Sequence, residues 1–366
     1  MKITIPTKQL IEGLNKLDKL KGKLVVFPIL EHVLLSASNN ETVTLTKTDM
    51  ESTIKVTLQG VDVEETGSII LPSSTIKLIK KIKDDYITIE DNKITTDKRN
   101  LNFIHLDIEN YPEQKSYAPA SDIELFTTTD KELKRLLEVK YAMGKDEEKP
   151  ILNSICFKGS DVVAVDGFKL SKRVGEYENS ITDELIVNSN TVNILDKLIK
   201  GKTDDKVYVS AYKGDGTICK FMTFKFNNVE VTGRLLDGSY IKYNSMIPEE
   251  YNLKSIVDAS ELLEELDFAK NIHTDKTKII ELNIQDDNMT IKCNGLSETA
   301  TSKINTINEF KNNDKNFNIA FNINYISDAL KIYKGDKIGL HFKSMLSPCV
   351  ITNDYKNLEL VCPYRI

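Results

Sequence analysis

The feature that most constrains the fold of this chain is one short unit that occurs three times in its 366 residues. In each copy an apolar strand leads through a polar cap into a helix with one apolar face and cationic residues on another face or toward its end. The caps are expected at Ser73 or Ser74, Asn188 and Asn322, which makes the copies 115 and 134 positions apart. A repeat of this length indicates duplication of whole domains.

The segments around the three units share one order of elements. Each segment is predicted to contain a strand, a helix, three strands, another strand, the repeated helix and further strands. Pro28-Ile-Leu-Glu31 in the first segment matches Pro150-Ile-Leu-Asn153 in the second. This order favours an α+β fold in which antiparallel sheets carry two helices on one face. We therefore predict three domains, at 1–120, 121–247 and 248–366, in a curved body with internal pseudo-symmetry.

Composition excludes some classes of protein. The chain is 40% hydrophobic and 28% charged, and it has no apolar run long enough to cross a membrane and no secretory signal. Its five scattered cysteines are expected to be reduced core thiols, which predicts a cytoplasmic location. A net charge of −6 argues against a protein coated with nucleic acid on every side. It leaves room for one basic concave surface, because salt screens charges over about 8 Å.

The sequence offers little for catalysis. No phosphate-binding loop, nucleophile elbow or metal-binding Cys/His pair occurs, so we expect neither a cofactor nor a metal site. Asp166-Gly167 and Asp237-Gly238 are expected to be turns. The four histidines are far apart and none has ligand spacing: His32, His105, His273 and His341. We predict a protein that is not an enzyme, and an enzyme with an unrecognised site is the least favoured alternative.

Two surfaces are candidates for binding. A single lysine-rich helix face is usually only solvated, but lysines at equivalent places in a repeat could converge on one surface and contact phosphates without reading bases. The helix predicted at Ser260–Ile272 differs, because glutamates make its polar face acidic. The apolar end of the chain, Leu358–Ile366, is either a closing edge strand or the border of an exposed partner site.

These features together resemble the bacterial sliding clamp family, the beta subunit of the replicative DNA polymerase III, over essentially the whole chain. Each matching motif is short, and their order and spacing carry the resemblance. The motifs are Pro28-Ile-Leu30 followed by Leu45-Thr-Lys-Thr-Asp49, Asp166-Gly167 with Leu170, Asp237-Gly238 with Tyr243 and Pro248, Phe321-Asn-Ile-Asn-Tyr325, and Val361-Cys-Pro-Tyr-Arg-Ile366.

The resemblance implies a head-to-tail homodimer in which each chain is half of a closed ring around duplex DNA. Helices would line the hole and contact phosphates loosely. The residues that would then face DNA are Lys21, Lys23, Lys77, Lys80, Lys81, Lys134, Arg135, Lys149, Lys197 and Lys200. Ring closure would join Leu101 and Phe103 in one chain to Ile272 and the 299–304 strand of the other.

The family also has a pocket between its second and third domains that binds short peptide motifs of polymerases, the clamp loader and repair proteins. The matching positions here are Leu152, Val165, Gly167, Phe168, Lys169, Leu170, Ile241, Ser245, Met246, Asn322, Tyr325, Leu346, Pro348, Leu360, Val361, Pro363, Tyr364, Arg365 and Ile366. Phe168 and Lys169 stand where the family commonly has His and Arg, Ile241 replaces a common Pro, and Ser245 replaces a common Arg. The pocket is expected to stay apolar and to lose polar contacts.

The acidic polar face at 260–272 keeps a second function open. A divergent copy of the clamp fold, from a phage, a plasmid or a paralogue, could bind peptides as an adaptor without encircling DNA.

Overall fold

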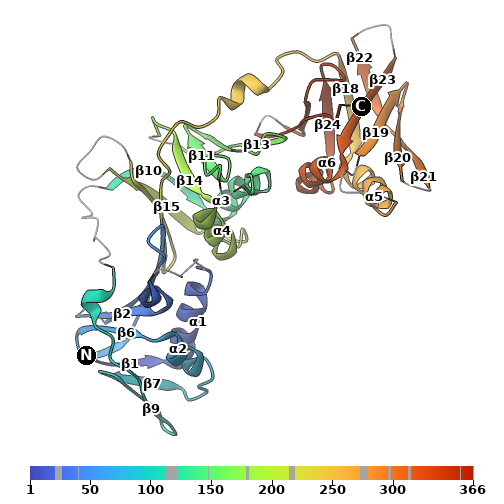
Figure 1. Ribbon diagram of the computed structural model, residues 1–366. Coiled ribbons are helices and arrows are strands. Elements are labelled where there is room, and N and C mark those ends of the chain that lie inside the picture. The colour runs from blue at the N-terminus through green and yellow to red at the C-terminus, as the bar shows by residue number, and fades with distance from the viewer. Residues whose placement is uncertain are drawn as a thin grey trace. The chain divides into compact units, whose positions relative to one another are not determined.

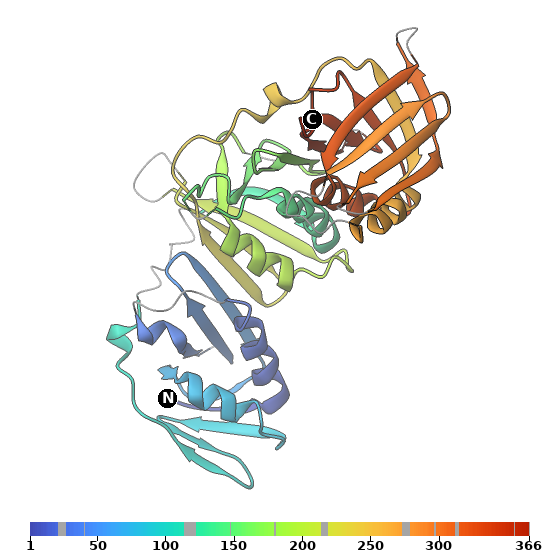
Figure 2. The ribbon, with the colours of Figure 1, turned by 45° about the vertical axis from the view of Figure 1, so that its right-hand side comes forward.

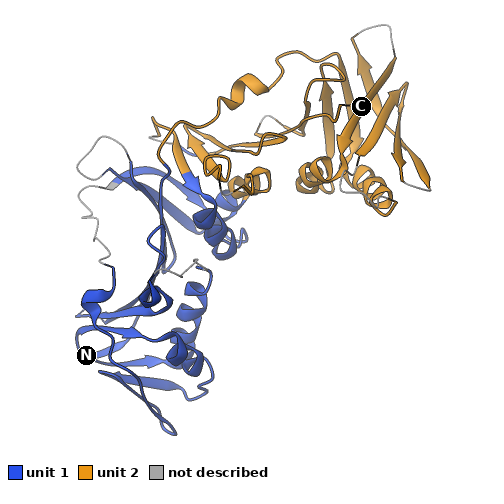
Figure 3. Cartoon of the chain, in the orientation of Figure 1, with its two compact units in different colours: residues 1–134, 177–180, 187–236 blue, residues 135–176, 181–186, 237–366 orange. Residues whose placement is uncertain are grey.

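The computed structural model describes residues 1–20, 27–39, 41–112, 122–146, 148–178, 181–213, 219–272, 279–295, 298–311, 315–354 and 356–365. The chain divides into two compact units, which Figure 3 shows in different colours. The first unit comprises residues 1–134, 177–180 and 187–236. The second comprises residues 135–176, 181–186 and 237–366.

An eight-stranded antiparallel sheet is the centre of the first unit (Figure 1). Its strands, in spatial order, are β10 (Asp122–Thr129), β15 (Lys206–Tyr212), β16 (Phe221–Phe226), β17 (Val229–Arg234), β4 (Ser52–Gln59), β3 (Thr42–Thr48), β2 (Val33–Ser38) and β6 (Gly67–Leu71). Strands β17 and β4 pair in the middle, with Val229 opposite Val56 and Gly233 opposite Ser52. Segments far apart in the sequence therefore share one continuous sheet.

A second sheet of the first unit has five strands. In order they are β5 (Asp62–Glu65), β1 (Lys2–Pro6), β7 (Tyr86–Glu90), β8 (Lys93–Thr95) and β9 (Asn100–Asn102). Strand β9 pairs only with β8 among the strands of this sheet, so one of its edges carries unpaired backbone groups. Strand β9 is short and ends at Asn102, before Phe103.

Helices α1 (Thr7–Leu17) and α4 (Ser189–Leu198) cover the same face of the eight-stranded sheet. Helix α1 packs on β3 and β4, and a Cβ at Gly13 would come within 2.8 Å of Leu45 Cδ1. Helix α4 packs on β17, where a Cβ at Gly233 would lie 2.4 Å from Thr191 Oγ1. Residues directly opposite each other on paired strands point to the same side of a sheet. Leu45 lies opposite Val56, and Gly233 lies opposite Ser52, on the same side of β4, so the two helices cover one face.

Helix α2 spans Ser73–Ile79, and its N-cap position is Pro72 rather than the expected Ser73 or Ser74. Proline fixes φ near the value that a helix start needs, so a hydroxyl cap is not required there. The backbone N–H of Ser73 instead donates to His32 Nδ1 at 3.2 Å. Short 3-10 turns also occur at η1 (Pro28–Glu31) and η2 (Ile108–Asn110).

The second unit has a nine-stranded antiparallel sheet and a four-stranded one. The first, in order, contains β14 (Leu185–Asn188), β11 (Ser154–Lys158), β12 (Asp161–Val165), β13 (Lys169–Val174), β26 (Asn357–Val361), β25 (Cys349–Thr352), β24 (Lys337–Phe342), β18 (Leu253–Asp258) and β22 (Ile307–Phe310). The second contains β21 (Thr299–Asn305), β20 (Asn288–Asn294), β19 (Ile279–Gln285) and β23 (Asn316–Asn322). Strand β21 is an edge strand.

Two helices of the C-terminal domain, α5 (Ala259–Lys270) and α6 (Ile323–Leu330), pack side by side against the four-stranded sheet (Figure 2). Leu262, Leu266 and Ala269 of α5 join the buried core, as its sequence pattern predicts. The carboxylate of Asp258 caps α5 by accepting from Ser260 N at 2.8 Å, so Ser260 itself is not the cap. Helix α3 (Asp130–Leu136) continues into η4 (Leu137–Ala142), while η5 (Tyr243–Met246) and η6 (Lys331–Tyr333) are single turns.

The threefold repeat is confirmed with one modification. The central domain has the expected order of elements from β10 to β17. The first and third domains each contain one further strand before the second helix, β5 and β22 respectively. The central domain is split between the two units because it contributes strands to two different sheets, one in each unit.

Candidate functional site

The C-terminal strand is joined to the central domain by a continuous ladder in the second unit. Strand β13 pairs with β26, and Lys169 lies opposite Val361. The turn before β13 is held by Asp166 Oδ1, which accepts hydrogen bonds from the backbone N–H of Phe168 and of Lys169, each at 2.8 Å. The N–H of Cys362 donates to the carbonyl oxygen of Phe168 at 2.9 Å. The Phe168 turn is therefore fixed to the end of the chain.

The pairing of β13 with β26 is a joint between two domains, because the two strands come from different domains. An aromatic pair lies at the surface of this joint. The ring of Phe168 stacks on that of Tyr325, with centroids 5.4 Å apart and an interplanar angle of 23°. The ammonium of Lys169 lies 5.3 Å from the Tyr325 ring centroid and donates to the carbonyl oxygen of Tyr141 at 3.1 Å. Phe168 is 56% exposed although it is a large apolar side chain, whereas Lys169 is only 7% exposed. The arrangement is an exposed aromatic surface above a buried cation.

The other predicted peptide-binding residues fall into three classes. Val165, Leu170, Leu360 and Val361 are fully buried beneath this surface. Exposed positions are Gly167, Ser245, Leu346, Tyr364 and Arg365. Half-buried positions are Leu152, Ile241, Met246, Asn322, Pro348 and Pro363. The Asn322 side chain is already used as the N-cap of α6, and Ile366 lies outside the described residues.

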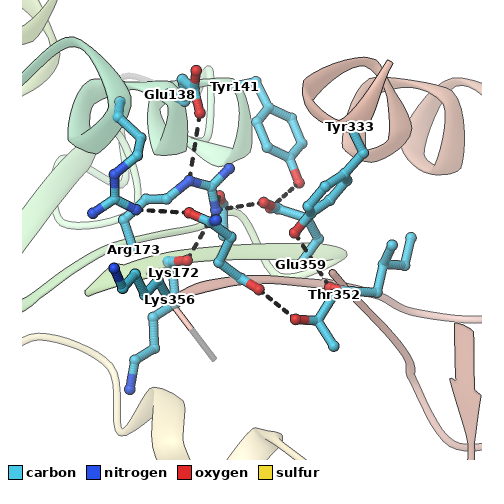
Figure 4. A network of polar contacts seen from close by, with 12 residues as sticks. Glu138, Tyr141, Lys172, Arg173, Tyr333, Thr352, Lys356 and Glu359 are labelled. Atoms are coloured by element: carbon cyan, nitrogen blue, oxygen red, sulfur yellow. Dashed lines mark hydrogen bonds and ion pairs between the residues drawn. The ribbon is translucent and has the colours of Figure 1, made fainter. Parts of the chain in front are cut away.

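The two paired strands, β13 and β26, carry a buried ion pair on the face of the sheet that η4 covers. Arg173 Nη1 is 2.6 Å from Glu359 Oε1, and both side chains are 0% exposed. Tyr141 donates its hydroxyl to Glu359 Oε2 at 2.5 Å, and Arg173 Nε lies 3.5 Å from a Glu138 carboxylate oxygen. Figure 4 shows these side chains converging from β13, β26 and η4. Burial raises the pKa of Glu359, and the Arg173 guanidinium opposes that rise.

The first unit has an equivalent joint, but its interior is apolar. The turn before β4 has the same hydrogen bonds as the turn before β13. Asp49 Oδ1 accepts from Glu51 N and Ser52 N, as Asp166 Oδ1 accepts from Phe168 N and Lys169 N. Counting from these turns, Val56 is equivalent to Arg173. Its diagonal neighbour Val231 is equivalent to Glu359, and both valines are 0% exposed. The two joints thus share a backbone geometry and differ in chemistry.

The predicted phosphate-contact residues are not all available. Lys80 forms an ion pair with Asp18. Lys134 Nζ lies 2.8 Å from Asp196 Oδ1, and it also donates to the Asp196 carbonyl oxygen. Arg135 donates to Asn357 Oδ1 at 2.7 Å and to the Val174 carbonyl oxygen at 2.6 Å. The exposed members of the set are Lys77, Lys81, Lys149, Lys197 and Lys200, while Lys21 and Lys23 lie outside the described residues.

The predicted dimer-interface residues lie at the two free edges. Leu101 is in β9 and Phe103 follows it, and both side chains are half-buried. Ile272 follows α5 and packs against the core of the C-terminal domain. A Cβ at Gly295, in the turn before β21, would come within 2.8 Å of Ile272 Cγ2. The residue therefore sits directly beside the β20–β21 turn.

Sequence reasoning missed two features of these sites. The Arg173–Glu359 pair was not expected in a core. Two apolar residues on helix surfaces, Phe268 of α5 and Leu78 of α2, are 57% and 47% exposed. The sequence held a signal for Phe268, because it lies off the apolar stripe of Leu262, Leu266 and Ala269.

The described residues contain neither a metal site nor a membrane-spanning helix. Within the described ranges, no group of three or more His, Cys, Asp or Glu side chains is placed to hold a metal ion. None of the helices that the structure describes has both the length and the hydropathy needed to span a bilayer.

Comparison with known proteins agrees with the repeat. Residues 1–115, 127–242 and 244–361 match the models of the N-terminal, central and C-terminal domains of the DNA polymerase III beta subunit. A beta sliding clamp from Staphylococcus aureus is 25% identical over 100% of this chain and 99% of its own length. The solved Bacillus subtilis DNA polymerase sliding clamp superimposes with a TM-score of 0.89 at 23% identity, over 100% of this chain and 99% of that one.

A solved DNA polymerase III beta subunit from Eubacterium rectale gives a TM-score of 0.90 at 24% identity and covers both chains fully. The three family models occupy nearly the whole sequence in the expected order. The chain therefore belongs to the DNA polymerase III beta subunit family, the sliding clamps, and is a three-domain, non-catalytic processivity factor of DNA replication.

Proposed function

We propose that two copies of this chain close head to tail into a ring that encircles duplex DNA and tethers a polymerase and other partners. The observation that carries the proposal is the repeated joint between domains. Two of the three joints that a threefold repeat needs are formed inside the chain, by β4 with β17 and by β13 with β26. The strands for a third joint are β21 and β9, and each has one edge that pairs with no other strand among the described residues. A heterologous contact of this kind closes into a ring or continues as a filament.

The repeat also supports one register for the third joint. The turns before β4, β13 and β21 have the same length, with Thr53, Leu170 and Thr299 each closing the hairpin. In the formed joints the third residue after that position, Val56 or Arg173, pairs with the first residue of β17 or β26.

The third residue after Thr299 is Ser302, which is on the same side of its sheet as buried Ala300 and Ile304. The first residue of β9, Asn100, is exposed, and the residue that shares a side with buried Ile94 is the next one, Leu101. Matching faces therefore favours Leu101 opposite Ser302 and Phe103 opposite Ala300. Leu101 and Phe103 would then lie on the side of Ile272, where each covers apolar surface.

Engineered cysteines test this joint. In a Cys362→Ser background, Leu101→Cys with Ser302→Cys should form a disulfide between copies on oxidation. Leu101→Cys with Thr301→Cys should react far less, because adjacent residues on a strand point to opposite faces. Sedimentation should give a mass of two chains before oxidation. A monomer at all concentrations, or equal cross-linking of both pairs, would reject the ring.

Contact with DNA is proposed for the exposed lysines of the helix layer. Lys197 lies in the last turn of α4 and Lys200 lies just beyond the helix, and α4 covers the same face of the sheet as α1. Lysines there can meet phosphates without base recognition. Lys197→Glu with Lys200→Glu should weaken retention on nicked circular duplex, and the salt slope should fall by about two. Lys225→Glu, a single exposed charge reversal on the other face of the sheet, is the control. Equal loss in both variants would contradict this placement.

Partner binding is proposed for the aromatic surface formed by exposed Phe168 and half-buried Tyr325. Aromatic anchors at the centre of an interface commonly contribute about 2 kcal/mol or more. Phe168→Ala should therefore weaken binding of a short peptide with aliphatic and aromatic anchors by about tenfold or more. Tyr208→Ala removes a similarly exposed ring in the first unit and is the control. Polymerase and clamp-loader peptides are the probes that the family suggests.

One observation favours the alternative of an adaptor that does not encircle DNA, namely the acidic face of α5. An adaptor would bind the peptide and show no preference for circular over linear DNA.

We further propose a cytoplasmic location and domain boundaries near 120 and 247. The strands that open the second and third domains, β10 and β18, begin at Asp122 and Leu253.

A further inference from the structure

We infer that the first unit carries a partner site of its own, a polar hollow that takes an acidic, extended segment of a partner protein. The hollow lies on the face of the eight-stranded sheet opposite α1 and α4, and its volume is about 640 Å³. The residues that line it and carry the argument are Thr44, Lys55, Thr57, Lys225, Asn227 and Glu230. All of them belong to the first unit, so the inference does not depend on ring closure.

The alternation of side chains along β4 fixes which of them face the hollow. Val56 is buried on the face that α1 covers. Its neighbours Lys55 and Thr57 therefore point to the other face. Lys55 lies opposite Glu230 of β17, and Glu230 lies opposite Lys225 of β16. Two lysines with one glutamate between them thus cross three neighbouring strands on this face.

One end of the hollow is a fixed wall. In the hairpin that joins β16 to β17, Asn228 Nδ2 donates to the carbonyl oxygen of Thr57 at 3.0 Å, and Asn228 Oδ1 accepts from Lys16 at 2.6 Å. At the end of β4, Gln9 Nε2 donates to the carbonyl oxygen of Gln59 at 2.9 Å. The lining is therefore held in place by the fold, and a ligand need not order it on binding.

The second unit shows the equivalent positions neutralised within the chain. Counting from the two matching turns, Lys172 is equivalent to Lys55. Asp161 is equivalent to Thr44, because each lies opposite the residue two positions after that lysine. Lys172 Nζ lies 2.7 Å from Asp161 Oδ2 and 5.8 Å from the ring centroid of Tyr243. The lysine of the second unit therefore has a carboxylate and an aromatic ring of its own.

In the first unit one carboxylate serves two lysines. Glu230 Oε1 lies 3.5 Å from Lys55 Nζ, and Lys225 is directly opposite Glu230 on the other neighbouring strand. Across the part of the chain that the structure describes, Lys225 forms no ion pair, and the hydroxyls of Thr44 and Thr57 have no hydrogen-bond partner. The hollow thus keeps a surplus positive charge and unused donors, which carboxylates and backbone carbonyl groups can accept from.

The dimensions of the hollow favour a peptide over a small anion. Lys225 in β16 and Thr44 in β3 are separated by three spacings between strands, which is about 14 Å. An extended chain of about four residues covers that distance. Among the described residues that line the hollow none is aromatic, so no ring is present to stack on a base. An extended acidic segment meets Lys225 with a carboxylate and the threonine hydroxyls with its carbonyl groups.

Peptide binding measured by fluorescence anisotropy at low salt tests the inference. The probe is a short dye-labelled peptide in which aspartate alternates with serine, and its counterpart has asparagine in place of aspartate. The parent should bind the acidic probe about fivefold or more tightly than the counterpart. Lys225→Glu should weaken binding of the acidic probe by about tenfold, and Lys225→Arg should stay within about threefold of the parent. Glu230→Gln removes the competing carboxylate and should tighten binding by about threefold.

A matched control has the same cross-strand arrangement in the second unit. Lys292 of β20 is exposed and lies opposite Glu281, as Lys225 lies opposite Glu230. Lys292→Glu makes the same charge change away from the hollow, so it should leave binding of the acidic probe unchanged.

The other outcomes overturn the inference. Equal affinity of the parent for the two probes, or equal losses in Lys225→Glu and Lys292→Glu, would show that the hollow does not select an acidic segment. Displacement of the probe by inorganic phosphate, at an ionic strength at which chloride has no effect, would assign the hollow to a small anion. A dimer dissociation constant that changes with Lys225→Glu would assign it to a second copy. An aliphatic and aromatic peptide of the kind proposed for Phe168 should not displace the probe, and displacement would place the acidic segment at that surface instead.

Discussion

The buried pair of Arg173 and Glu359 gives the sharpest test of how the second unit is held together. Removing one partner leaves the other charge buried, since both side chains are 0% exposed. Such a loss typically costs about 3–5 kcal/mol. Glu359→Leu also leaves the Tyr141 hydroxyl without its acceptor, which adds about 1–3 kcal/mol. We therefore expect Glu359→Leu or Arg173→Met alone to destabilise the nine-stranded sheet severely.

Replacing both partners should be far less harmful. The equivalent positions of the first unit, Val56 and Val231, show that this joint tolerates an apolar interior. Replacing a buried ion pair by packed apolar residues is often neutral or stabilising. Arg173→Met with Glu359→Leu should thus cost only the about 1–3 kcal/mol of the unpaired Tyr141 hydroxyl. Adding Tyr141→Phe should then bring the stability near that of the parent.

Thiol labelling can measure this within the second unit. Cys349 in β25, next to β26, is 0% exposed, so it reacts only when the sheet opens. A loss of about 3 kcal/mol or more raises its labelling rate in mild urea on the order of a hundredfold. Cys219, a buried thiol of the first unit, is the internal control. A single variant whose Cys349 rate changes less than about fivefold, or a double variant whose cost equals the sum of the singles, would refute the reasoning.

Three further results are expected. Burial lowers the pKa of His32, whose Nδ1 accepts a hydrogen bond from Ser73 N, so the unfolded chain binds more protons at this residue than the folded chain does. The free energy of unfolding should therefore fall as pH drops below about 6.5. His32→Asn should flatten that part of a Tm–pH curve, and an unchanged slope would contradict this reasoning. Gly233→Ala should cost about 1–3 kcal/mol in urea unfolding because the new methyl meets Thr191, and a neutral result would show that α4 can move away. Phe168→Ala should leave Tm within about 2 °C of the parent while lowering peptide affinity, because the ring is mostly exposed.

The periodic parts of the fold were predictable from the sequence. The helical spacing of Leu10, Leu14 and Leu17 and the alternation around Val43 and Leu45 are local patterns in the sequence, and these side chains form buried faces in the structure. The end of α2 was less predictable, because Lys80, Lys81 and Ile82 continue the helical pattern although the helix ends at Ile79. A helix boundary of this kind is set by the turn that follows, not by the apolar stripe.

The pairing of side chains across distant segments could not be predicted. Arg173 alternates with polar Ser171 and Lys169, a pattern typical of the solvent-facing side of a strand. It is nevertheless buried between η4 and β26, and its partner in β26, Glu359, lies 186 positions later in the sequence. Lys80 looked free for phosphate contact, and its partner Asp18 comes from another helix end. The stacked pair of exposed Phe168 and half-buried Tyr325 likewise depends on two segments that meet only in the fold.

The central claim is that two chains form a closed ring around DNA, and topological linkage tests it most directly. Leu101→Cys with Ser302→Cys in the Cys362→Ser background is mixed with nicked circular duplex, oxidised and then denatured. We expect covalently closed rings to stay with the circle in denaturant and to be released when the DNA is linearised. Loss of the protein from circular and linear DNA alike, despite complete disulfide formation, would contradict the account.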